Sequence, residues 1–161
     1  MRRWKLLLVL IPFIVGPAFA GPLEDASAAF TRGDYAAAAD LWRPLAEQGN
    51  ATAQYNLGAL YERGRGVAKD QAAAVEWFRK AANQGNAKAQ FNLGFRYSAG
   101  TDVPQDDVQA YMWLELAASQ RTAFTEEDRK RIVQTRDIVA LKMPPAQLTA
   151  AKKLVQEWKP K

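Results

Sequence analysis

The fold is decided by the stretch Gly49-Asn50-Ala51-Thr52-Ala53-Gln54-Tyr55-Asn56-Leu57-Gly58, which the chain repeats as Gly85-Asn86-Ala87-Lys88-Ala89-Gln90-Phe91-Asn92-Leu93-Gly94. The second copy follows the first at an offset of 36 residues without a gap. The same offset continues downstream, where Tyr61 corresponds to Tyr97 and Trp77 to Trp113. A fixed period of about 20 to 50 residues is typical of stacked supersecondary units. The sequence therefore predicts two consecutive repeat units, at residues 49–84 and 85–120.

Segments with helical spacing of apolar residues alternate with turns after residue 20, and none shows the clear alternation of a β-strand. The pattern predicts about eight helices, at residues 23–31, 35–48, 51–63, 71–83, 87–99, 107–119, 126–143 and 145–158. Residues suited to cap the N-termini of these helices are Asp34, Asn50, Asp70 and Thr125. Gly58 lies inside a predicted helix, where it would let two helix backbones approach closely. We therefore expect an all-α fold.

The first 20 residues predict a signal peptide. Arg2, Arg3 and Lys5 precede an apolar run over residues 6–15, and Ala18-Phe19-Ala20 resembles an A-x-A cleavage site. The apolar run is shorter than the roughly 20 residues that a membrane-spanning helix needs. We expect secretion with cleavage after residue 20, and a mature protein without an integral membrane segment.

Composition excludes several kinds of chemistry. The 161 residues contain no cysteine and no histidine, so disulfides, thiol catalysis and the usual general base near neutral pH are excluded. The formal net charge of +5 falls to +2 without the three basic residues of the predicted signal peptide. Most of the remaining basic character lies in residues 121–161, which hold 10 basic and 5 acidic residues. We expect no cofactor, no metal and no nucleic-acid partner.

Three motifs recur in both units: A-x-A-Q-[YF]-N-L-G, Y-x-x-G-x-x-V-x-x-D and W-[FL]-x-x-A-A, over residues 51–82 and 87–118. With these motifs the chain resembles the Sel1-like repeat family, a relative of tetratricopeptide repeats. The resemblance extends over a repeat region at residues 21–120, with a partial unit at 33–48, and leaves residues 121–161 as a C-terminal helical cap. The second copy departs from the pattern at Asp102, where the first has Gly66, so we expect that loop to differ.

The resemblance implies a right-handed α-solenoid of antiparallel helix pairs that acts as a non-catalytic adaptor. It also implies a bacterial source, and with the signal peptide it implies a periplasmic location. The implied partner is a protein or peptide of unknown identity.

One candidate site is the concave face of the solenoid. On helix 51–63 and its copy, nine residues lie on the arc opposite the expected core: Thr52, Tyr55, Asn56, Ala59, Arg63, Lys88, Phe91, Asn92 and Phe95. Such surfaces bind extended partners in solenoid proteins. Asn56 and Asn92 could pair with a peptide backbone, and the aromatic residues could serve as anchors. The alternative is that these residues only pack and bond between adjacent helices.

Two charged groups are further candidates. A basic group could receive an acidic protein or an anionic lipid or glycan surface, or it could be a solvated helix face: Arg129, Lys130, Arg131, Arg136, Lys152 and Lys153. An acidic group could support acid–base work or bind a cation, although acids also stabilise helix starts: Asp102, Asp106, Asp107 and Glu115.

The sequence thus favours a non-catalytic interaction module of the bacterial envelope that binds a partner on its concave face. Two alternatives stay open: a hydrolase acting on cell-wall material, and a structural scaffold of an envelope complex.

Overall fold

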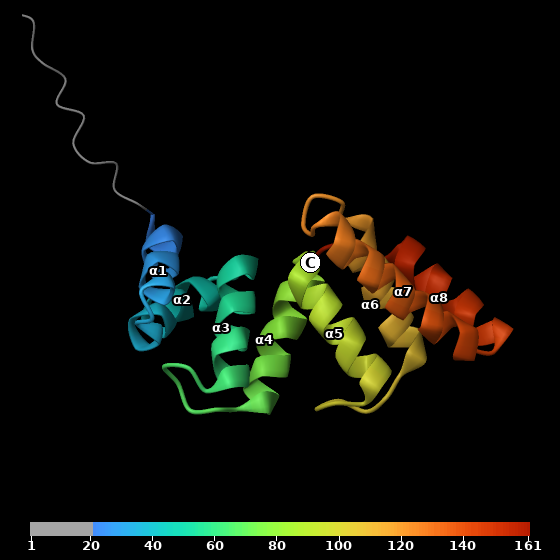
Figure 1. Cartoon of the computed structure of the whole chain (residues 1–161), viewed down its shortest axis with the longest axis horizontal. Helices are drawn as coiled ribbons and strands as arrows, with labels where there is room; N and C mark the ends of the chain where they lie inside the picture. Colours follow the sequence, from blue (N-terminus) through green and yellow to red (C-terminus); the bar gives the residue numbers. More distant parts are fainter. Residues whose placement is uncertain (1–20) are drawn as a thin grey trace, which may run out of the picture.

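The computed structural model describes residues 21–161, and the predicted signal peptide lies outside the described residues. Within this range the regular structure is α-helical, and the helices follow one another in a row from α1 to α8 (Figure 1). They are α1 (Pro22–Thr31), α2 (Tyr35–Glu47), α3 (Ala51–Arg63), α4 (Gln71–Asn83), α5 (Ala87–Ala99), α6 (Asp107–Ser119), α7 (Glu126–Lys142) and α8 (Pro145–Glu157). The predicted all-α fold is confirmed, and each predicted helix agrees with an observed one to within about a residue at each end.

The helices begin where polar side chains cap them. The side-chain oxygens of Asn50 and Asn86 accept hydrogen bonds from the N–H groups of Ala53 and Ala89, at 2.9 and 3.0 Å. The same contact is made by the four other capping residues: Asp34, Asp70, Asp106 and Thr125. Each cap satisfies an N–H that the helix itself leaves without an acceptor, so the predicted caps are confirmed.

Successive helices from α1 to α6 pack on one another and form an α-solenoid. The two glycines at the middle of α3 and α5 allow close approaches between paired helices. A Cβ at Gly58 would lie 3.0 Å from the Phe78 ring, and one at Gly94 would lie 2.7 Å from Leu114 Cγ. Both distances are shorter than ordinary van der Waals contacts, so neither position has room for a side chain. The close helix approach predicted at Gly58 is therefore confirmed, and the second unit shows the same approach at Gly94.

The last two helices depart from this pairing. α7 and α8 each pack on α6, and their backbones approach α6 more closely than they approach each other. Their core includes Ile132 and Val139 from α7 and Ala151 from α8, all almost fully buried against α6. The segment after α8 then turns back, so that Trp158 reaches Gly85 and the N–H of Lys161 donates to the carbonyl of Asn83 at 2.9 Å. The predicted C-terminal cap thus covers α6 with two separate helices.

Two buried glutamines join the units. Gln54 Nε2 donates to the carbonyl of Ala46 at 3.0 Å, and its Oε1 accepts from Gln84 Nε2 at 2.7 Å. The second unit repeats this arrangement at the same offset, with Gln90 bonded to Ala82 and Gln120. The glutamines therefore add a second donor to carbonyls near the C-terminal ends of α2 and α4, which also accept from the N–H groups of Gly49 and Gly85.

None of the helices between residues 21 and 161 has the length and apolar character needed to cross a membrane.

Candidate functional site

The nine predicted residues all line pockets on one side of the solenoid. We call this surface the odd-helix groove, because its walls come mainly from α1, α3, α5 and α7. A pocket of about 300 Å³ lies between α1 and α3, and its lining includes Asn56, Ala59 and Arg63. A second, of about 360 Å³, includes Thr52 and Lys88. The structure thus brings the predicted set onto a common surface, and its role in binding stays a prediction.

Another pocket of this groove has a volume of about 490 Å³ and lies over α5. Three helices line it: Tyr55 and Arg63 come from α3, Phe91 from α5, and Arg131 from α7, among others. The surface is therefore hollowed between α3 and α7, with α5 as its floor.

The groove carries positive charge and a neutral hydroxyl. Arg63 and Lys88 are exposed and form no ion pair with any described residue, whereas Arg131 pairs with Glu127. Burial raises the pKa of Tyr55 above its usual value, so the hydroxyl stays protonated and can donate or accept a hydrogen bond. This part of the groove suits a partner with polar backbone groups and some negative charge.

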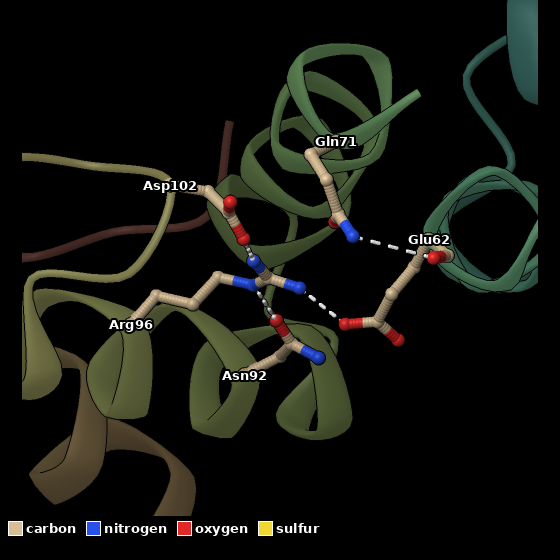
Figure 2. Close-up of polar contacts among 5 residues, drawn as sticks. All are labelled: Glu62, Gln71, Asn92, Arg96 and Asp102. Carbon is tan, nitrogen blue, oxygen red and sulfur yellow. Dashed lines mark hydrogen bonds and ion pairs between the residues drawn. The ribbon is translucent and has the colours of Figure 1, made fainter. Parts of the chain in front are cut away.

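A further pocket, of about 430 Å³, lies between α3 and α5 and contains a charged cluster. Arg96 is only 6% exposed, and its guanidinium binds the carboxylates of both Glu62 and Asp102 (Figure 2). Its Nε donates to Asn92 Oδ1 at 2.6 Å, and its guanidinium lies 5.6 Å from the centre of the Phe78 ring. Each of the three nitrogens of the buried guanidinium thus donates to an oxygen, which compensates for the loss of water around the charge.

This cluster depends on two differences between the repeats. Arg96 occupies the position of Leu60, and Asp102 occupies that of Gly66. Asp102 has a φ of 59°, close to the 69° of Gly66, although only glycine adopts this conformation freely. We expected this loop to differ between the two units. The backbone φ is nearly the same at this position in both, and the difference lies in the Asp102 side chain, which binds Arg96.

The two asparagines of the predicted site are not equivalent. Asn92 Oδ1 accepts from Arg96, so its oxygen is partly engaged and its amide N–H groups are the donors left for a ligand. Asn56 makes no side-chain hydrogen bond with the described residues, and both its donors and its acceptor are available. The predicted pairing with a peptide backbone thus has more support at Asn56 than at Asn92.

Glu62, Gln71 and Arg96 were not among the predicted site residues. Gln71 Nε2 donates to the Glu62 carbonyl at 3.4 Å, and its Oε1 is buried without a hydrogen-bond partner. A charged residue at a position where the other repeat has a buried leucine is the sequence signal that could have identified Arg96.

The other charged candidates are mostly engaged within the fold. In the basic group, Arg129 pairs with Glu126 and Arg136 pairs with Glu115 and Asp137. In the acidic group, Asp106 caps α6. Between residues 21 and 161, no three or more acidic side chains gather in a way that could hold a metal ion.

Known proteins resemble both the repeats and the whole arrangement. The family model of the Sel1 repeat matches residues 51–86 and 87–121. The structure of a Sel1 repeat protein from Oxalobacter formigenes is 33% identical, with a TM-score of 0.60, over 70% of this chain and 86% of that one. A protective antigen of uropathogenic Escherichia coli with an SLR fold is 31% identical, with a TM-score of 0.73, over 85% of this chain. This chain spans 29% of that antigen's length. No curated protein matches.

Proposed function

Since this chain belongs to the Sel1 repeat family, we propose that it is a non-catalytic adaptor that binds a partner peptide or domain in the odd-helix groove. Sel1 repeats are generally protein–protein interaction modules, and proteins of this fold are typically non-catalytic. The chemistry of the groove itself supports binding of the partner there.

The observation that carries the proposal is the continuity of the groove over three helices. Its pockets hold aromatic side chains from α3 and α5 beside polar groups that the fold leaves available. Aromatic anchors surrounded by hydrogen-bonding groups are the usual composition of peptide-binding surfaces. Exposed Arg63 and Lys88 add long-range attraction for a partner with acidic residues at this part of the groove.

The proposed location is the bacterial envelope, and the predicted signal peptide supports it. Secretion after cleavage at residue 20 would place the solenoid in the periplasm, where a protein without cysteine has no thiol to oxidise.

The test compares two double variants that each remove two exposed cations. One changes the groove, Arg63→Ala with Lys88→Ala, and the other changes α8, Lys152→Ala with Lys153→Ala. Each protein is immobilised and incubated with bacterial envelope extract, and retained proteins are identified by mass spectrometry. Peptides of the retained partner are then titrated against each variant by calorimetry.

We expect the groove variant to bind the partner about tenfold more weakly, because two favourable charge contacts are lost, and the α8 variant to bind like wild type. Equal affinities for wild type and the groove variant would contradict the proposal. Loss only in the α8 variant would instead favour the scaffold alternative, with the basic end as its interface.

The hydrolase alternative has weaker support, because the strongest carboxylate candidates already have structural partners. Asp102 binds Arg96, Glu115 binds Arg136, and Asp106 caps α6. Turnover of cell-wall fragments that is abolished by Asp106→Asn with Asp107→Asn would revive it.

A further inference from the structure

We propose that the pocket between α3 and α5 is a subsite for one lysine or arginine side chain of the partner peptide. The inference rests on the proposed function, since it assigns a residue preference to one position of the same groove. The subsite is formed by Glu62, Asp102 and Phe95 around the buried Arg96.

The charge of the pocket is complementary to a cation. Its lining holds two carboxylates and one guanidinium, which gives a net charge of −1. Arg96 engages one oxygen of each carboxylate, and the second oxygen of each has no hydrogen-bond partner among the described residues. The Glu62 and Asp102 side chains are 25% and 29% exposed, so a ligand can reach them. Partial burial also reduces screening by salt, which strengthens the attraction.

The pocket has an apolar wall for the stem of such a side chain. Phe95 is 54% exposed although it is large and apolar, and Phe91 lines the pocket beside it. Lysine and arginine place their methylene groups along apolar surfaces while the charged head reaches a polar partner. An aromatic face also attracts the cation directly.

The pocket has room for one side chain of a longer peptide. Its volume of about 430 Å³ lies in the range of about 300 to 1,000 Å³ of pockets that hold whole small molecules, so a single lysine or arginine side chain can enter it. The first unit lacks this subsite, because Ala59 and Leu60 stand where the second unit has Phe95 and Arg96. One basic residue per peptide is therefore expected, next to the positive part of the groove around Arg63 and Lys88.

The test uses three pools of immobilised decapeptides whose fixed central residue is lysine, norleucine or glutamate. All other positions are drawn from uncharged residues, so that the fixed residue supplies the only variable charge. Norleucine matches the lysine stem without its charge. Retention of the labelled wild-type protein is expected to be about tenfold higher on the lysine pool than on the norleucine pool.

Two variants should move the lysine preference in opposite directions, and a third serves as the control. Glu62→Gln keeps an acceptor for Arg96 but brings the pocket charge to zero, and the lysine preference should fall to about twofold or less. Arg96→Leu introduces the residue of the first repeat and makes the pocket charge −2, so the preference should rise. The matched control Glu76→Gln removes an exposed carboxylate of α4 that does not line this pocket, and it should leave the preference unchanged.

The outcomes separate the subsite from the proposed function. Equal retention on all pools, lost in the Arg63→Ala with Lys88→Ala variant, would overturn the subsite and support groove binding. Preference for the glutamate pool would overturn the subsite in favour of an acidic partner residue. Retention on none of the pools would overturn the subsite, because the lysine pool supplies its preferred residue, whereas groove binding is decided separately by the envelope partner and the Arg63→Ala with Lys88→Ala variant.

Discussion

At the first junction of the solenoid, where α3 and loop 64–70 meet α1 and α2, Leu60 is buried in an apolar cluster with Trp42. Gly66 there lies so close to α2 that a Cβ would overlap the backbone of Tyr35. At the second junction, where α5 and loop 100–106 meet α3 and α4, the equivalent positions hold Arg96 and Asp102. The cluster of Arg96, Glu62 and Asp102 replaces the apolar contact.

The two junctions have the same backbone arrangement, but one is joined by apolar side chains and the other by a charged cluster. An apolar junction gains free energy from burial and offers a ligand little specific chemistry. A charged junction gains little net stability, because desolvation offsets much of the ion-pair energy, but it leaves oriented carboxylates at an open pocket. The second junction therefore combines structural and recognition roles, and its residues are the ones to vary.

The largest effect is expected from filling the glycine contact of the first junction. Gly66→Ala adds a Cβ that overlaps the backbone of Tyr35 and Ala36, and it strains a φ of 69°. We expect a loss of about 3 to 5 kcal/mol in the free energy of unfolding, measured by urea denaturation. The control is Gly49→Ala, where φ is also positive but nothing lies within 4 Å of the added Cβ, so only about 1 to 2 kcal/mol should be lost.

The second prediction converts the charged junction stepwise into the apolar one. Arg96→Leu alone leaves two partly buried carboxylates without their cation, and should lower the unfolding free energy by about 2 to 4 kcal/mol. Adding Asp102→Gly removes one carboxylate and relieves the positive φ of residue 102, and should recover at least about 1 kcal/mol. A double variant less stable than the single one would show that Asp102 stabilises this loop without Arg96.

The third prediction concerns a feature that the two junctions share. Gln54→Ala and Gln90→Ala each remove a buried amide that satisfies a helix carbonyl and a second glutamine. Each should cost about 2 kcal/mol, with the two losses equal to within about 1 kcal/mol, because the bonds are the same in both units. Thermal unfolding followed by circular dichroism measures both, and a large inequality would mean that the junctions differ beyond the charged cluster.

The smallest effect is expected at the caps of the second helix in each unit. Asp70→Ala and Asp106→Ala each remove an acceptor for one exposed N–H, and each should cost about 1 kcal/mol in urea denaturation. The substitutions Asp70→Asn and Asp106→Asn keep the acceptor and should restore most of the loss. If the asparagine variants stay as unstable as the alanine variants, the carboxylate charge rather than the cap contributes the stability.

The repeat period made the helices and their caps predictable from sequence, because the relevant interactions are local. Asn50 and Asp70 cap the next residues along the chain, and the apolar spacing repeats without an insertion. The same reasoning placed Tyr55, Asn56 and Phe91 on one surface, since a helical step fixes which side chains share a face. The existence of a groove there follows from the structure, and partner binding in it remains to be tested.

The charged cluster could not be predicted in the same way, because it depends on contacts between units. An arginine on a helix normally indicates solvent exposure, yet Arg96 is buried because Glu62 of the preceding unit and Asp102 of the following loop both reach it. The separate packing of α7 and α8 on α6 also escaped prediction. Their apolar residues indicate which face is buried, but not which neighbour covers it.

The returning segment after α8 affects how the chain responds to force. A stack that contacts only its neighbours can unravel from an end, one unit at a time. Here Trp158 and Lys161 contact the turn between α4 and α5. Tension applied at the C-terminal end therefore acts first on these contacts. While these contacts hold, the helices from α5 to α8 lie inside a closed loop and should not bear the pull. Once the contacts break, these helices should unfold together and give a single rupture in a pulling trace, rather than successive helix-sized steps.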